Sequence, residues 1–120
     1  MSELFALFAH GAPGDDPVAR DGEVATQLRN ADRRARLAAY AYFYANPDPS
    51  RIGDLIDAVT TEGTPFGQYW GVRALRRSVQ AAPAPLDAPT RHRLEQLATT
   101  LEPDTDGAGE LRDLLSETAG

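Results

Sequence analysis

The sequence predicts an all-α protein: a compact bundle of five or six helices in a single domain over residues 1–120. Apolar residues recur at helical spacing, most clearly in the series i, i+3, i+4, i+7 at Ile52, Leu55, Ile56 and Val59. Pro and Gly separate such segments, and Ser, Thr or Asp stands where helices are expected to begin. The one segment rich in β-forming tyrosines, residues 40–44, has no second convincing strand to pair with.

Residues 1–17 are expected to form an apolar N-terminal segment followed by a loop. Residues 4–9 are apolar almost all round, so this segment has to pack on the domain or on a partner. The candidates for a contact between copies of the chain are Leu4, Phe5 and Phe8. The segment lacks a positive flank and is short for a signal peptide. We therefore expect a cytoplasmic protein, which could equally be one domain of a longer chain.

Residues 18–101 are the predicted helical core. Its first part is helical to residue 45, with an interruption near Gly22 or a new start at Asn30. Three arginines in this part have the spacing i, i+4, i+7 of one helical face: Arg29, Arg33 and Arg36. Residues 37–45 carry no charge, and a helix that is apolar on every side is expected to be buried on every side. This segment is the predicted central helix.

Three more helices follow before residue 101, each ended by Gly or Pro. Their expected capping residues are Asp48, Thr64, and either Asp87 or Thr90. The second of them covers residues 65–82. The residues expected to face the core in the first and third are Ile52, Leu55, Ile56, Val59, Leu94, Leu97 and Leu101.

An acidic C-terminal helix, residues 102–120, completes the predicted fold. It starts near Asp106 and is expected to bury Leu111, Leu114 and Leu115. Six acidic residues and one arginine give this region a net charge of −5, of the −6 carried by the whole chain.

The composition restricts the classes of function. An acidic chain is a poor general binder of nucleic acid or of anionic membranes, and no apolar run reaches the ~18 residues of a membrane-spanning helix. The absence of Cys excludes disulfides and thiolate metal sites. All twelve basic residues are Arg. Together with abundant Ala, Gly, Pro and Asp, this indicates the codon bias of a GC-rich, bacterial genome rather than selection for phosphate binding.

A shift of 39 residues aligns four identical pairs: Asp48 with Asp87, Leu55 with Leu94, Thr60 with Thr99, and Thr61 with Thr100. A two-helix unit of this length resembles the repeat of the HEAT and armadillo families, whose period is roughly 40–47 residues. Within the resemblance, residues 72–75 (Val-Arg-Ala-Leu) are similar to the Val-Arg-x-Ala part of a HEAT second helix. The resemblance covers residues 31–101 and implies an α-hairpin scaffold with an interaction role.

The helix of residues 65–82 has two different faces when its residues are placed at 100° intervals. One face is apolar and is expected to pack on the core. The other carries arginines, with aromatic residues at its N-terminal end. The candidate partner-binding residues on it are Phe66, Tyr69, Trp70, Arg73, Arg76, Arg77 and Gln80; the second candidate group is Arg29, Arg33 and Arg36.

The aromatic residues of this helix have two interpretations. They are buried against neighbouring helices, which is the usual position of Trp in a small domain. Alternatively they form an exposed patch with the arginines, because Trp, Tyr and Arg are enriched in interface hot spots. The two can coexist, with Trp70 buried and the arginines exposed. Gly67 and Gly71 permit close helix approach, or leave a notch that Tyr40 or Phe43 fills.

The arginines also have two interpretations. Together they could form a basic patch for nucleic acid or for an acidic partner. Alternatively the acidic C-terminal helix neutralises one of the clusters within the fold.

Catalytic motifs are missing. His10 and His92 do not have the paired spacing of a metal site, and the chain has no nucleophile elbow and no phosphate-binding loop. We therefore expect no catalytic residues, no metal, no cofactor and no enzymatic activity. The expected function is a protein–protein interaction, adaptor or regulatory module whose partner is another protein, an acidic one included. The alternatives are a small-molecule-binding helical domain or enzyme accessory domain, with a pocket at Tyr40, Tyr44 and Trp70, and a nucleic-acid-binding regulator.

Overall fold

The computed structural model describes residues 17–118, except for the side chains of residues 17–19 and 21. This part of the chain contains six α-helices, one short 3-10 helix and no strand: α2 (Pro17–Gln27), α3 (Arg33–Ala45), η1 (Pro49–Arg51), α4 (Ile52–Thr61), α5 (Pro65–Gln80), α6 (Ala88–Thr100) and α7 (Asp106–Glu117). The predicted all-α bundle is confirmed. The expected contact residues Leu4, Phe5 and Phe8 lie outside the described residues. Within the described part, every helix is too short or too polar to cross a membrane.

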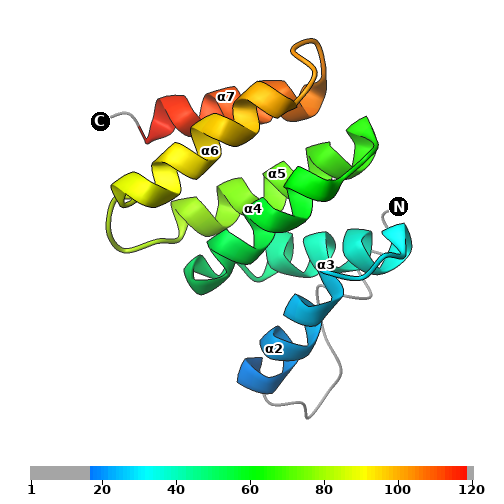
Figure 1. Cartoon of the computed structure of the whole chain (residues 1–120). Coiled ribbons are helices and arrows are strands. Elements are labelled where there is room, and N and C mark those ends of the chain that lie inside the picture. The colour runs from blue at the N-terminus through cyan, green and yellow to red at the C-terminus, as the bar shows by residue number, and fades with distance from the viewer. Residues whose placement is uncertain (1–16, 119–120) are drawn as a thin grey trace.

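The helices stack in successive pairs (Figure 1). α6 and α7 lie along one end of the molecule, α4 and α5 cross the middle, and α3 with α2 lies at the other end. α5 packs against α3, α4 and α7, which makes it the helix with the most neighbours. Residues 37–43 of α3 are buried without exception, as expected for their uncharged sequence.

Capping side chains start most of these helices. A side-chain oxygen accepts a hydrogen bond from a backbone N–H of the first turn and satisfies a donor that the helix itself leaves open. The caps observed are Asp32 for α3, Asp48 for η1, Thr64 for α5, Asp87 for α6 and Thr105 for α7. The predicted caps at Asp48 and Thr64 are confirmed, and the choice between Asp87 and Thr90 falls to Asp87.

The predicted arginine face of Arg29, Arg33 and Arg36 is wrong. α2 ends at Gln27, and the chain turns before Asp32 caps α3. Asn30 stabilises this turn, because its side-chain oxygen accepts a hydrogen bond from the backbone N–H of Asp32 at 2.8 Å. Arg29 therefore lies outside the helix that carries the other two arginines, and the helical spacing does not apply to it.

A close helix contact at Gly71 fixes α5 against α3 and α4. A Cβ atom at Gly71 would clash with Cγ2 of Val59 on α4 and lie 3.2 Å from Cζ of Tyr40 on α3. Tyr40 thus fills the notch, as one of the two sequence interpretations predicted. All three residues are buried. The glycine costs helix stability of about 0.5–1 kcal/mol but allows the three helices to approach closely.

A buried ion pair joins two turns of the bundle. Nε of Arg36 donates to Oε1 of Glu62 at 2.7 Å, and the Glu62 side chain has no solvent exposure. Nη1 of Arg36 also donates to the backbone carbonyls of Asn30 and Ala31, at 2.8 and 2.9 Å. The carboxylate fits only because residue 67 is glycine: a Cβ there would lie 2.5 Å from Oε2 of Glu62. The α2–α3 turn and the α4–α5 turn are therefore tied through one guanidinium.

Substituting Gly71→Ala should lower the free energy of unfolding by about 1–3 kcal/mol, because the added methyl group overpacks the contact with Val59. Gly109→Ala in α7 is the matched control, since its Cβ would meet nothing within 4 Å. We expect that control to stabilise the protein by about 0.5–1 kcal/mol through helix propensity. Urea unfolding followed by circular dichroism measures both. Equal effects of the two substitutions would contradict the close contact.

Substituting Glu62→Ala should lower the free energy of unfolding by about 3 kcal/mol, because Arg36 then keeps a largely buried charge without its partner. The exposed Glu102→Ala is the control and should change stability by less than about 0.5 kcal/mol. The comparison uses urea unfolding at neutral pH. A loss at Glu62 no larger than that at Glu102 would show that the ion pair does not hold the turns together.

Candidate partner-binding groove

Five side chains of α5 follow one another along a single stripe. Their spacing alternates between four and three residues, as in the seam of a coiled coil, so they lie on the same side of the helix. From the N-terminal to the C-terminal end they are Phe66, Trp70, Arg73, Arg77 and Gln80. Phe66, Arg77 and Gln80 are exposed, and Trp70 and Arg73 are half-buried. The stripe is therefore open to solvent at both ends.

Arg73 is enclosed by aromatic rings. Its guanidinium carbon lies 5.0, 5.6 and 5.5 Å from the ring centroids of Tyr44, Tyr69 and Trp70. Its nitrogens donate to the hydroxyl of Tyr69 at 2.9 Å and to that of Tyr44 at 2.8 Å. Burial opposes the charge of Arg73, but the hydrogen bond that it donates to Tyr69, together with the neighbouring Tyr44 and Glu110, leaves its pKa above the usual value. The cation is thus held in one orientation.

The rings around Arg73 also hold one another. Trp70 meets Tyr44 edge-on at a centroid distance of 6.1 Å and Tyr69 at 5.3 Å. Edge-to-face pairs at such distances are favourable by roughly 0.5–1.5 kcal/mol each. Tyr44 comes from α3, so these contacts brace the stripe of α5 against a second helix.

Arg77 continues the cationic part of the stripe. Its guanidinium carbon lies 4.8 Å from the ring centroid of Tyr44. Unlike Arg76, neither Arg77 nor Arg73 forms an ion pair with a carboxylate among the side chains that the structure describes. Arg77 is exposed, so its charge remains available to a ligand.

Arg76 is used within the fold. It donates to Glu110 at 2.8 Å and to both carboxylate oxygens of Glu117, with Asp113 at 4.0 Å. These hydrogen bonds raise the pKa of Arg76, and the bond from Arg76 lowers the pKa of Glu117. The expectation that the acidic C-terminal helix neutralises one arginine cluster is therefore met at Arg76 alone.

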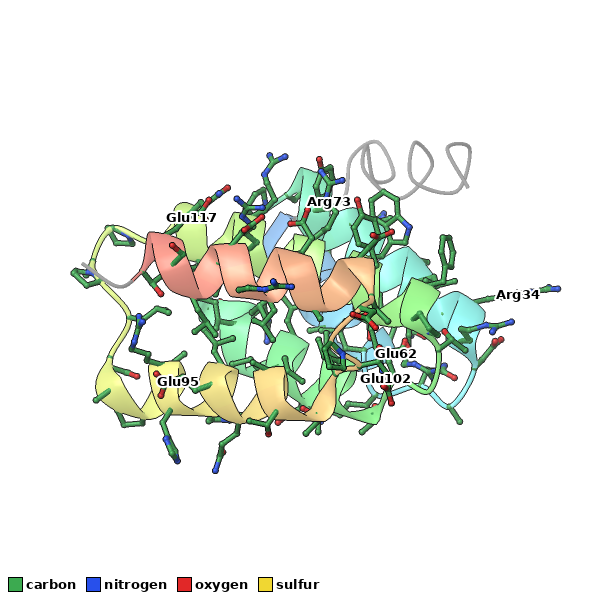
Figure 2. The ribbon with its side chains drawn as sticks, turned by 90° about the horizontal axis from the view of Figure 1, so that it is seen from above. Arg34, Glu62, Arg73, Glu95, Glu102 and Glu117 are labelled. Atoms are coloured by element: carbon green, nitrogen blue, oxygen red, sulfur yellow. The ribbon has the colours of Figure 1, made fainter. Side chains whose placement is uncertain are left out.

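The arginine end of the stripe lies in a hollow between α3 and α7. The hollow has a volume of about 150 Å³ and is lined by Tyr44, Arg73, Arg76, Arg77, Gln80 and Glu110. We call this hollow, together with the stripe that leads into it from Phe66, the α5 groove. Arg73 and Glu117 lie on the side of the molecule away from α6 and Glu95 (Figure 2).

The other candidate residues lie elsewhere. Arg36 is bound to Glu62, and Arg33 is exposed at the start of α3. Arg29 is 79% exposed and lies 3.8 Å from Asp54. Of the three residues expected to line a small-molecule pocket, Tyr40 is fully buried, whereas Tyr44 and Trp70 reach the surface of the α5 groove. The two interpretations of the aromatic residues are both partly met, since Trp70 packs against the core and Phe66 is 46% exposed.

Sequence reasoning did not place Tyr44 and Glu110 beside the arginines. Tyr44 contacts Arg73 across 29 residues of sequence, and Glu110 contacts Arg76 across 34. Helical spacing relates residues within one helix only, so it carries no signal for either contact. Among the described residues, no group of three or more His, Cys, Asp or Glu side chains could hold a metal ion.

The fold and the groove define a compact all-α domain with an arginine–aromatic surface. Comparison with known proteins finds no family model, no curated protein and no solved structure that matches this chain.

Substituting Arg76→Gln should destabilise the protein by roughly 1 kcal/mol at neutral pH, because partly exposed ion pairs of this kind contribute little. The pKa of Glu117 is lower in the folded state than the ordinary glutamate value of about 4.3. The ion pair therefore stabilises the fold fully at pH values above that ordinary value, and its contribution is lost as the pH falls through the folded-state pKa. The difference in unfolding free energy between the wild type and Arg76→Gln should therefore narrow at acidic pH. Arg112→Gln on the exposed side of α7 is the control and should show no such trend.

Proposed function

We propose that this chain is a non-catalytic protein–protein interaction module, of the adaptor or regulatory kind, and that the α5 groove is its contact surface. The observation that carries the proposal is the enclosure of Arg73 by three aromatic rings beside the exposed Arg77. Trp, Tyr and Arg are the residues that most often dominate binding energy at interfaces.

The rigidity of the groove supports a binding role. Binding normally costs roughly 0.5–1.5 kcal/mol for each flexible side chain that becomes ordered. Arg73 is already ordered by two hydrogen bonds and three ring contacts, so a ligand would not incur this cost for it.

A protein partner is better supported than nucleic acid. Of the arginines that could have formed one basic patch, Arg36 and Arg76 are bound to carboxylates within the fold. The cationic surface that remains in the α5 groove is small, and Glu110 lines it. Phosphate-backbone binding depends on many cationic contacts spread along the nucleic acid.

The proposal includes a HEAT-like or armadillo-like scaffold for residues 31–101. Residues related by the 39-residue shift occupy equivalent positions. Leu55 and Leu94 are both completely buried, and Asp48 and Asp87 both cap a helix start. The four threonines lie at the ends of α4 and α6, and each donates its hydroxyl to a carbonyl of the preceding turn: Thr60, Thr61, Thr99 and Thr100. These equivalences and the stacked pairs in Figure 1 support the scaffold.

Site-specific photo-cross-linking in the native cells tests the proposed function. A photoreactive phenylalanine analogue at Gln80, in the groove, should cross-link one defined protein. The same analogue at the exposed Gln96 of α6 should not. Combining the Gln80 probe with Arg73→Glu and Arg77→Glu should abolish the product while helicity is retained.

Arg77→Glu alone serves as a second variant if the double substitution impairs folding, because Arg77 is exposed. Cross-linking of the same protein from both probe positions would refute the assignment of the contact surface to the groove. Full cross-linking from Gln80 in the folded Arg77→Glu variant would refute it as well.

A further inference from the structure

The two ends of the α5 groove differ in chemistry. The N-terminal end presents the exposed ring of Phe66 and the partly exposed Trp70, and the C-terminal end presents Arg73, Arg77 and Gln80. The stripe spans fifteen residues, or about 21 Å of helix at 1.5 Å per residue. Its alternating spacing of four and three residues is the spacing at which one helix packs along another. The groove thus offers an apolar contact at one end and a cationic contact at the other. Its length matches that of a helix of four turns.

α7 shows which ligand one arginine of α5, Arg76, accepts. It presents carboxylates at i, i+3 and i+7, and all three lie within 4.0 Å of the guanidinium of Arg76. Gln80 adds a hydrogen bond to Glu117 at 3.3 Å. An acidic helix is therefore already bound along one side of the arginine row. Arg77, one residue further along the chain, points into the groove without such a partner among the described residues.

We propose that the partner presents a helix whose binding face is apolar at one end and acidic at the other. Its apolar side chains pack on Phe66 and Trp70, and its carboxylates pair with Arg77 and with the remaining N–H groups of Arg73. This inference rests on the proposed function and names the class of partner for the same groove. Arg73 has N–H donors left for this purpose, because a guanidinium carries five and the two tyrosine hydroxyls accept two.

Charge complementarity favours this occupant over a polyanion. The cationic end of the groove has Glu110 in its lining and Glu117 next to Gln80. A nucleic-acid backbone with a phosphate at every nucleotide would bring negative charges to these carboxylates. A helix, by contrast, can carry carboxylates only at the positions that face Arg73 and Arg77. Its other positions can be apolar or neutral. Opposed like charges of this kind are a source of specificity against wrong partners.

The test uses two synthetic helix-forming peptides of 16 residues and the full chain. One carries Leu at positions 2 and 6 and Glu at positions 9 and 13; the other has the reversed sequence, so that both helix directions are sampled. Calorimetric titration should show binding of at least one peptide. Replacing its Glu residues by Gln should weaken binding about tenfold or more, and replacing its Leu residues by Ala should weaken it to a similar degree.

Charge reversal makes the test specific to Arg77. Arg77→Glu should weaken binding of the acidic peptide about tenfold, whereas Arg112→Glu, an equal change of charge on the exposed side of α7, should leave it unchanged. A peptide with Arg in place of Glu should bind Arg77→Glu better than it binds the wild type. Circular dichroism verifies that each variant is folded.

Several results would overturn the inference. They are failure of both peptides to bind the wild type, equal binding of the Glu and Gln peptides, and tighter binding of a 16-nucleotide single-stranded RNA. None of these results would refute the proposed function if the probe at Gln80 still cross-links one defined protein. In that case the groove binds a partner of different chemistry. Loss of the Gln80 cross-link together with loss of peptide binding would remove both.

Discussion

The ion pair between Arg36 and Glu62 joins two turns of the bundle that lie far apart in the sequence. Arg36 ties the end of the α2–α3 turn to the α4–α5 turn, and Glu62 is completely buried where it receives this charge. The glycine at residue 67 leaves the space that the carboxylate occupies at the start of α5. Burial, with Glu62 next in importance, raises the pKa of the Tyr40 phenol, so this ring stays neutral inside the core. This buried charge pair therefore links the start of α5 to the α2–α3 turn, in addition to the helix contact at Gly71.

α5 has two roles on opposite sides of one helix. Its small residues, Gly71 and Ala74 among them, are buried and let α3 and α4 approach closely. Phe66, Trp70, Arg73, Arg77 and Gln80 face the groove, whose arginine end is lined by α3 and α7. The same packing that buries one side thus sets the spacing of the groove walls on the other. A substitution at Gly71 would therefore alter the groove by shifting the backbone of α5, and the new side chain would not need to contact Arg73.

Most of the fold could be predicted from the sequence because its signals are local. Caps such as Thr64 and Asp87, the prolines after them and the apolar spacing of α4 lie within a few residues of what they determine. The error at Arg29 arose in a short turn, where a capping side chain outweighed helical spacing. The stripe of α5 was also predictable from its spacing. Tyr44, Glu110 and the burial of Glu62 were not, because each depends on contacts between helices that are distant in sequence.

The cationic end of the groove is built from guanidinium groups in a chain without a single lysine. Arginine stays protonated throughout the physiological pH range, and it is not a substrate for the lysine acetylation that removes charge from many protein surfaces. The positive charge of the groove is consequently permanent once the chain has folded. For the proposed partner, control over binding would therefore have to act on the partner or on the surrounding carboxylates. A phosphoryl group added to a partner helix, for example, would meet a charge that the cell has no simple means of switching off.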